Sequence, residues 1–379
     1  MPRHRVVLIA IAALVIFVTF RADANREIPD SVTLPDGTQL NVETVAGDFD
    51  TVWDMNWAPD GAMWITERGG RVARLDVSTG VATSVGEVPG VTERGESGLM
   101  GFAFHPDFAR EPWVYFAHSY TPAGGGIGNR LVRMRYEAGM LGQMEVLLDG
   151  LRGAGNHNGS RLAIGPDRHL YMTMGEAGQR SRSQQRESLS GKILRLTLDG
   201  KAAPDNPFGT EVWSWGHRNP QGLVFHPGGA LYSAEHGGRA EDEVNRIEKG
   251  ANYGWPVIEG MCNTGQERET CPAFVEPLAV MAPTVGIAGL EYYGGDLIPG
   301  WKGSLIAVAL RGASLYRIAL SPDGRSSTNV ERLFQNQFGR LRDALTGPDG
   351  SLYLATSNRD GRGSPAADDD RILRLRPAR

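Results

Sequence analysis

The sequence predicts an all-β protein, a six-bladed β-propeller whose blades are four-stranded antiparallel sheets. A turn motif followed by a short alternating strand recurs six times along the 379 residues. Glycine accounts for 50 residues, about double its usual share, which suits many tight turns between short strands. Beyond residue 24, no segment shows the long apolar period of 3.6 residues that is typical of an amphipathic helix.

Each copy of the repeat begins with a Pro-Asp or Pro-Gly turn and continues as an alternating apolar strand with an aromatic residue. Proline fixes φ for the turn, Asp and Gly complete it, and a half-buried strand alternates apolar with polar side chains. The six copies, of which the fifth is the weakest, lie at residues 57–64, 104–116, 164–171, 225–232, 299–306 and 346–353. Another short strand follows each copy, for example at residues 72–75, 193–196, 314–318 and 371–375.

The spacing of the copies indicates how they assemble. Consecutive prolines of the motif are 47 to 72 residues apart. A four-stranded blade needs about 40–50 residues, so the surplus is available for long loops. Six such units close into one ring, whereas a β-sandwich with repeated hairpins fits six regular copies poorly.

Composition and motif content argue against several function classes. The 39 basic and 44 acidic residues give a formal charge of -5, so no basic excess is available to bind nucleic-acid phosphates. No Gly-x-Gly-x-x-Gly joins a strand to a helix, so a nicotinamide dehydrogenase is not indicated. No Gly-x-Ser-x-Gly is present either, and a serine hydrolase of the elbow type would lack its nucleophile.

The N-terminal segment is typical of a signal peptide. A basic stretch at residues 3–5 precedes an apolar run at 6–20, and alanines stand at positions 22 and 24. A run of this length suits a signal-peptide core better than a membrane span, which needs about 20 apolar residues. We therefore predict a cleaved signal peptide at 1–24, a single propeller domain at 25–379, and a periplasmic or secreted protein. The alternative is an uncleaved N-terminal anchor.

The two cysteines, Cys262 and Cys271, lie nine positions apart in a polar segment. In an exported protein this spacing predicts one disulfide that closes a short surface loop. Two thiols without a neighbouring histidine or third cysteine are too few ligands for a zinc site.

Polar, glycine-rich segments interrupt the repeat and contain most of the candidate functional residues. They are residues 155–162, 216–223, 235–245 and 339–343. The first, second and fourth stand at the same place in the blade, on the strand that enters the Pro-Asp turn. Equivalent positions of a propeller converge on one rim of the channel, so we expect their side chains to face one another.

Several of these residues have both a functional and a structural interpretation. His157 could cap a turn, and the acidic stretch 241–243 could be a solvated loop. Arg218 could be a surface charge, although an inward arginine is costly without an anionic partner. Arg340 and Arg342 alternate along a strand, point the same way and would repel unless a multivalent anion lay between them. His105 and His226, which precede turn prolines, are interpreted as structural.

At these segments the sequence resembles the soluble quinoprotein sugar dehydrogenases. This is the glucose/sorbosone dehydrogenase family, and the resemblance is greatest to its bacterial aldose sugar dehydrogenase branch. Residues 216–222, Gly-His-Arg-Asn-Pro-Gln-Gly, are its most specific segment, and 98–108, 252–256 and 340–343 support it. The resemblance covers about residues 40–375, and the family fold is a six-bladed propeller, in agreement with the repeat count.

The resemblance implies a function. It implies oxidation of the anomeric carbon of aldose sugars to lactones, by hydride transfer to the tricarboxylate cofactor pyrroloquinoline quinone (PQQ). His157 resembles the general base, and Glu176 stands where the family places a carboxylate that orients and polarises that histidine. Some members have Asp at this position. Arg218 resembles the arginine that lies over the quinone and stabilises negative charge as the hydride arrives.

The resemblance also implies the binding residues. The cofactor-binding side chains are expected to be Glu96, Arg218, Asn219, Arg311, Arg340 and Arg342. Glucose-type relatives carry Lys at the position of Arg311 and an amide at that of Glu96. A calcium ion is expected on the backbone carbonyls of Gly237 and Gly238, the second of which is often Pro in the family. Hard oxygen ligands suit Ca²⁺, which tolerates irregular geometry.

Two other function classes stay open at this point. A calcium-dependent lactonase on a similar propeller would need an inward cluster of Asp, Glu and Asn, whereas the inward motifs here are rich in arginine. A non-catalytic carbohydrate-binding propeller would lack the His157–Glu176 pair. If His157 is not the base, His217 is the next candidate. The sequence has no Cys-x-x-Cys-His haem site, so electrons would leave to an external quinone, cytochrome or dye.

Overall fold

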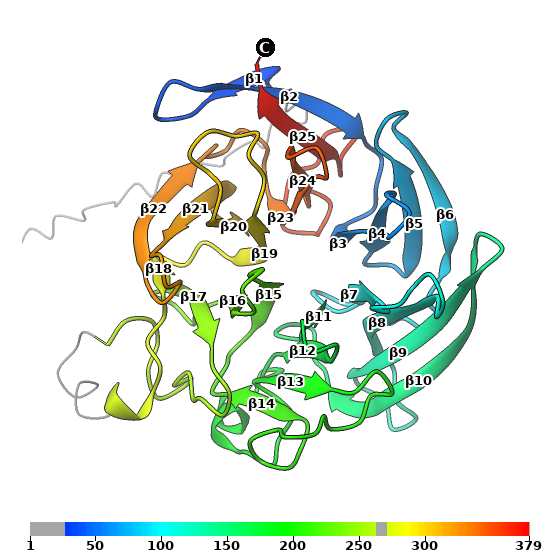
Figure 1. The fold of residues 1–379 in the computed structure, drawn as a ribbon. Helices are drawn as coiled ribbons and strands as arrows, with labels where there is room; N and C mark the ends of the chain where they lie inside the picture. The colour runs from blue at the N-terminus through cyan, green and yellow to red at the C-terminus, as the bar shows by residue number, and fades with distance from the viewer. Residues whose placement is uncertain (1–26, 263–270, 379) are drawn as a thin grey trace, which may run out of the picture.

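The structure, a computed structural model, describes residues 27–262 and 271–378. These residues form six antiparallel sheets arranged as a ring around a central channel (Figure 1). The predicted all-β, six-bladed propeller is thus confirmed. The predicted signal peptide, 1–24, lies outside the described residues. Within the described ranges, no helix is long and apolar enough to cross a membrane.

Each blade begins at the channel and adds strands outward. The first two blades contain β3 (Val52–Trp57), β4 (Met63–Glu67), β5 (Arg71–Asp76) and β6 (Val81–Glu87), then β7 (Leu99–Phe104), β8 (Trp113–Tyr120), β9 (Gly128–Glu137) and β10 (Met140–Arg152). The third and fourth contain β11 (Gly159–Ile164), β12 (Leu170–Met174), β13 (Lys192–Leu196) and β14 (Val212–Trp215), then β15 (Pro220–Phe225), β16 (Leu231–Glu235), β17 (Asp242–Ile247) and β18 (Ala279–Met281). The fifth contains β19 (Ile287–Tyr293), β20 (Ser304–Ala309), β21 (Ser314–Leu320) and β22 (Ser327–Leu333).

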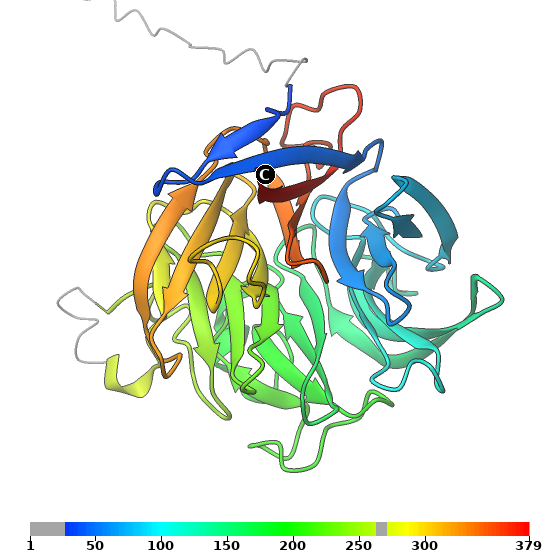
Figure 2. The same ribbon diagram turned by 45° about the horizontal axis from the view of Figure 1, so that its top comes forward.

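The sixth blade joins the two ends of the described chain. It contains β23 (Leu341–Thr346), β24 (Leu352–Thr356) and β25 (Ile372–Pro377), and the N-terminal strand β2 (Gln39–Ala46) pairs antiparallel with β25. A fifth strand, β1 (Ser31–Thr33), pairs with the outer side of β2. Figure 2 shows this hairpin lying along β25. The ring is therefore closed by hydrogen bonds between distant parts of the sequence.

The repeated turns join the first strand of each blade to the second. In the third blade, for example, the N–H of Gly165 donates to the carbonyl of His169 over 2.9 Å, and in the sixth blade Gly347 donates to Ser351 over 2.7 Å. The polar segments that enter β11, β15 and β23 therefore lie at the opposite end of the channel from the turns. These segments therefore lie at one common rim of the channel, where the sequence predicted them.

The hydrophobic core is divided among the interfaces between neighbouring blades. Trp64, Phe102 and Phe116, for example, pack between the first and second blades. The innermost strands pack closely around the channel. A Cβ atom at Gly101 of β7 would lie 2.4 Å from the carbonyl oxygen of Ser160, so glycine is required for this approach.

Buried charges link the inner strands across the channel. Arg161 of β11 pairs with Asp54 of β3, and its Nη1 lies 3.1 Å from Oδ2 of Asp343 on β23. Each carboxylate also accepts a backbone N–H of the next blade, Asp54 from Phe102 and Asp343 from Met55, both over 2.9 Å. Burial raises the pKa of Asp54 to about 8, against the opposing effect of Arg161. This triad lines a cavity of about 280 Å³ at the turn end of the channel.

Two short 3-10 helices complete the described structure, η1 (Arg180–Gln184) and η2 (Cys271–Ala273). The second begins at Cys271, whose sulfur is bonded to that of Cys262. The predicted disulfide is therefore confirmed.

Candidate active site

The end of the channel opposite the turns is hollow. One cavity there, of about 330 Å³, is lined by His157, Arg218, His236, Arg311, Arg340 and Arg362, among others. A second cavity, of about 300 Å³, adjoins it and shares His236, Arg340 and Arg362. Such volumes fall at the lower end of the range for small-molecule sites. The segments that enter β11, β15 and β23 each contribute a lining residue, as the sequence predicted.

His157 lies directly before β11 with its ring at the cavity. Its Nδ1 is 2.8 Å from Oε1 of Glu176, which is buried just after β12. Its Nε2 is 3.1 Å from Nη2 of Arg218. Because a guanidinium only donates hydrogen bonds, Nε2 must be the acceptor, and the ring proton is on Nδ1, facing Glu176. The sequence-predicted pair thus presents an unprotonated nitrogen to the cavity.

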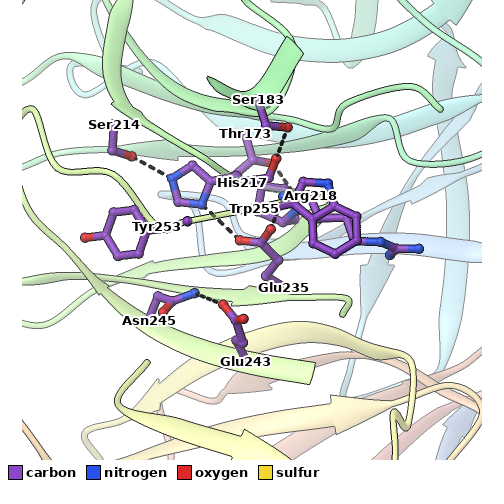
Figure 3. Close-up of polar contacts among 12 residues, drawn as sticks. Thr173, Ser183, Ser214, His217, Arg218, Glu235, Glu243, Asn245, Tyr253 and Trp255 are labelled. Carbon is purple, nitrogen blue, oxygen red and sulfur yellow. Dashed lines mark hydrogen bonds and ion pairs between the residues drawn. The ribbon is translucent and has the colours of Figure 1, made fainter. Parts of the chain in front are cut away.

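Arg218, directly before β15, is held from several sides (Figure 3). Its backbone N–H donates to the carboxylate of Glu235, its Nη1 donates to the carbonyl of His236 over 3.1 Å, and its guanidinium lies 5.2 Å from the ring centroid of Trp255. Burial lowers its pKa, although Glu176 and Glu235 oppose this effect. Its Nε is buried and has no hydrogen-bond partner among the described residues.

His217, the second candidate for the base, lies behind Arg218, away from the cavities. Its Nδ1 is 2.9 Å from Oε2 of Glu235, its Nε2 is 2.8 Å from Oγ of Ser214, and its ring stacks on Tyr253 at 4.7 Å (Figure 3). The side chain is fully buried and lines neither cavity. With both nitrogens engaged, His217 orients Glu235 and thereby the backbone of Arg218.

The two cavities carry an excess of positive charge. Six arginines line them, and three of these pair with carboxylates: Arg68 with Glu93, Arg340 with Asp360 and Arg362 with Glu96. The other three, Arg218, Arg311 and Arg342, form no ion pair in the described part of the chain. Arg342 is buried and Arg218 is partly buried, whereas Arg311 is exposed. A buried charge without a partner is costly, so this arrangement favours a ligand with several negative charges.

Arg342 is the most deeply buried of the unpaired arginines. Its Nη1 donates to Oε1 of Gln221 over 2.7 Å, and its Nε is buried without a partner among the described residues. Burial lowers its pKa to about 10, which still leaves it charged at neutral pH. Arg340, two residues earlier, lines the same cavity, with Nε 2.9 Å from Oδ2 of Asp360.

Asn219 occupies a different place from the other predicted cofactor residues. It is fully buried and lines neither cavity. Its Oδ1 accepts the backbone N–H of Gly159 over 3.1 Å. Asn219 therefore supports the backbone that follows His157.

The loop at Gly237 and Gly238 is held through its N–H groups. Oδ1 of Asp242 accepts the N–H of Gly237 over 2.8 Å, and Oε1 of Glu259 accepts those of Arg239 and Ala240 over 2.7 and 2.9 Å. A Cβ atom at Gly238 would lie 2.8 Å from the ring of Trp255 and 2.9 Å from Oε2 of Glu259. A larger residue at this position would therefore crowd both side chains.

The acidic stretch 241–243 is not the solvated loop that its composition allowed. Asp242 and Glu243 are buried. Oδ2 of Asp242 accepts the N–H groups of Val285 and Ile287 over 2.7 and 3.0 Å, and Glu243 accepts that of Gly260 over 2.7 Å. The solvated interpretation is therefore wrong for these two residues, because they satisfy backbone donors of neighbouring segments.

Sequence reasoning missed several lining residues. His236 lines both cavities, and its Nε2 is buried without a hydrogen-bond partner in the described ranges. Asp360 and Arg362 come from the loop between β24 and β25, which carries no recognisable motif. His236 directly precedes Gly237, one of the predicted calcium ligands. Its position beside that residue could have indicated His236 as a lining residue.

Comparisons with known proteins place the chain among sugar-oxidising enzymes. The family model described as Glucose / Sorbosone dehydrogenase matches residues 49–373. The aldose sugar dehydrogenase YliI of Escherichia coli strain K12 is 32% identical over 345 residues, covering 85% of this chain and 91% of that protein. Quinoprotein glucose dehydrogenase B of Acinetobacter calcoaceticus is 28% identical over 463 residues, covering 98% and 96%. The PQQ-bound structure of aldose sugar dehydrogenase from Streptomyces coelicolor superposes with a TM-score of 0.79 at 37% identity, covering 89% of this chain and 98% of that one.

Proposed function

The chain belongs to the glucose/sorbosone dehydrogenase family, and on this premise we propose that it oxidises the anomeric carbon of aldose sugars to lactones by hydride transfer to PQQ. One observation carries the proposal. A single hollow joins a histidine with an acceptor Nε2 to arginines that have no carboxylate partner within the described residues. Proton removal beside an anionic quinone needs both features. The relatives named above, one of them solved with PQQ, support it as well.

The lining residues fit a tricarboxylate quinone. Arg311, Arg340 and Arg342 would hold its carboxylates, and Arg218, whose Nε lacks a partner among the described residues, would face the quinone oxygens. Asn219 supports the backbone that follows His157 and lines neither cavity. When bound, the quinone supplies the acceptor for the hydride.

A calcium ion is the second proposed component. The carbonyl oxygens of Gly237 and Gly238 accept no hydrogen bond among the described residues. Asp242 and Glu259 hold the same loop through N–H groups, so these carbonyls stay available as hard oxygen ligands. When bound there, calcium would polarise a quinone carbonyl.

His157 acts on the sugar. Its Nε2 takes the proton of the anomeric hydroxyl, which replaces Arg218 as the donor to this nitrogen. The hydrogen bond from Nδ1 to Glu176 fixes the ring and stabilises the imidazolium that forms. Loss of this proton prepares the sugar carbon to give up its hydride to the bound quinone, and an external quinone, cytochrome or dye would be the final electron acceptor.

The lactonase alternative would need a different lining. In the described ranges, no group of three or more His, Cys, Asp or Glu side chains is placed to hold a metal ion. The arginine-rich lining instead favours an anionic ligand. The non-catalytic alternative gives no reason for the 2.8 Å contact between His157 and Glu176.

Titration of the purified, cofactor-free protein tests the proposal. PQQ added with calcium should bind with a change in quinone absorbance, and a subsequent aldose should reduce the bound quinone. Dye-linked oxidation of aldoses should appear only when both additions are present. Absence of quinone binding by calorimetry and absorbance would end the proposal.

Export is a separate proposal. We expect cleavage between Ala24 and Asn25, and the Cys262–Cys271 bond should form after export. The intact mass of protein from the cell envelope tests both points. A mass that includes residues 1–24 would support the anchor instead.

A further inference from the structure

We propose that Glu96 and Arg362 are positioning residues for the base His157, joined by an ion pair that is called the clamp below. The proposal rests on the proposed function in one respect, that His157 is the base. It assigns Glu96 a different role from direct cofactor binding, and it gives Arg362 a role that no sequence motif indicated.

Glu96 contacts the segment that carries His157 in two ways. Its carboxylate Oε2 accepts the backbone N–H of His157 over 3.2 Å, and its own backbone N–H donates to the carbonyl of Gly155 over 2.8 Å. The two loops approach closely, since a Cβ atom at Gly95 would lie 2.4 Å from that same carbonyl oxygen. Glu96 is therefore bound to the backbone of the base.

The backbone of His157 needs such support. Its φ is 56°, in the left-handed region that residues other than glycine adopt at a cost. Its carbonyl accepts the N–H of Ala177 over 3.0 Å, and a Cβ atom at Gly175 would lie 1.9 Å from that carbonyl oxygen. Contacts on both sides of the peptide thus hold an unfavourable conformation, and Glu96 supplies the contact to the N–H.

Arg362 completes the clamp from the loop between β24 and β25 of the sixth blade. Its Nη1 lies 2.6 Å from Oε1 of Glu96, and its backbone N–H donates to Oδ1 of Asp360 over 2.9 Å. The same Asp360 holds Arg340 through its other oxygen. A continuous set of contacts therefore runs from a proposed cofactor-binding arginine to the backbone of the base.

The charges of this clamp are balanced. Burial raises the pKa of Glu96, but His236 and the hydrogen bond from Arg362 outweigh it and leave the pKa below its usual value. Glu96 is thus ionised, and Arg362 neutralises it beside a site that is proposed to hold an anion. Each carboxylate oxygen of Glu96 already has a protein partner, Oε2 the N–H of His157 and Oε1 the guanidinium of Arg362.

Hydrogen exchange on the quinone-free protein tests the clamp independently of the enzymatic proposal. Glu96→Ala should speed amide exchange in the peptide covering residues 153–160 by about 10-fold, because the N–H of His157 loses its acceptor. Glu96→Gln keeps an acceptor oxygen and should leave this exchange within about 2-fold of wild type. Glu145→Gln, which removes one carboxylate of the exposed Arg133–Glu145 pair, is the control. Wild-type exchange in Glu96→Ala would overturn the proposal, whether or not the protein binds quinone.

The loaded enzyme separates positioning from direct binding. In Glu96→Ala, kcat should fall about 10-fold or more, because a displaced base loses much of its effect, while the quinone dissociation constant rises less than about 3-fold. Arg362→Gln leaves Glu96 unneutralised, so it should weaken quinone binding about 3-fold or more, and Arg362→Lys should restore it. A large loss of quinone affinity in Glu96→Ala with unchanged kcat would instead make Glu96 a ligand and overturn the proposal.

Discussion

The two ends of the channel use the same residue types for different purposes. Toward the turns, Arg161 is neutralised by Asp54 and Asp343, and the three side chains tie blades together. Toward the other end, Arg218 and Arg342 have no carboxylate partner in the described part of the protein. A buried arginine alone therefore does not indicate a functional site. A buried arginine without a carboxylate partner does.

Gln221 marks the boundary between the two ends. Its backbone carbonyl accepts Nε of Arg161 over 3.0 Å, and its side-chain oxygen accepts Nη1 of Arg342 over 2.7 Å. The ring of Trp53 lies against both guanidiniums, 4.6 Å from that of Arg161 and 5.6 Å from that of Arg342. Two arginines that share neighbours thus differ chiefly in whether a carboxylate is present.

The largest effect on stability is expected at the turn end of the channel, where Arg161 has carboxylate partners. Arg161→Met should lower the free energy of unfolding by about 3–5 kcal/mol, because Asp54 and Asp343 would be left buried without their cation. Chemical denaturation of the quinone-free protein measures this. A loss below about 1 kcal/mol would show that the triad does not hold the blades together.

At the opposite end of the channel, where Arg218 and Arg342 lack carboxylate partners in the described residues, the largest effect is expected on turnover. His157→Ala should lower kcat about 100-fold or more, because general-base catalysis is typically worth about 10²–10⁴. Quinone affinity should hardly change, since the arginines hold the cofactor. Near wild-type turnover with quinone bound would mean that another group is the base.

The third prediction contrasts Arg342 directly with Arg161. Arg342→Ala should weaken quinone binding by about 10-fold or more, while the unfolding free energy falls much less than in Arg161→Met. Arg74→Ala, at an exposed ion pair with Asp60, is the matched control and should do neither. Equal loss of affinity in both alanine variants would place the quinone site elsewhere.

The smallest effect is expected from Glu176→Gln. This change keeps the shape of the Glu176 side chain but removes its negative charge, which stabilises the protonated form of His157. The base itself remains, so kcat should fall less than in His157→Ala. The pH–rate profile should move to lower pH, because an imidazole without a carboxylate partner loses its proton more easily. An unchanged profile would show that Glu176 only fixes the ring orientation.

The fold was predictable because its repeat is local. Each turn motif specifies a hairpin within about ten residues, and the number of hairpins sets the number of blades. The convergence of His157, Arg218 and Arg340 followed from their equivalent positions in the repeat. The pairing of β2 with β25 was not predicted, because it joins distant segments and no local pattern specifies the partner of either strand.

The rest of the site depends on tertiary placement. Asp360 and Arg362 lie in a loop without a motif, and only the ring brings them to Arg340 and Glu96. The burial of Asn219 and of Asp242 was hidden for the same reason, since composition does not show which backbone donors need an acceptor.

The closure of the ring has a mechanical consequence. Because β2 and β25 are antiparallel, Leu40 pairs with Pro377, so the first residues of β2 and the last residues of β25 lie at the same end of their ladder. A pull that separates the two strands from that end would load the outermost pair first and break the ladder one pair at a time. A pull along either strand would load all the pairs together. Moving the two strands together therefore leaves the ring unstressed, whereas drawing them apart at that end opens the sixth blade one pair at a time.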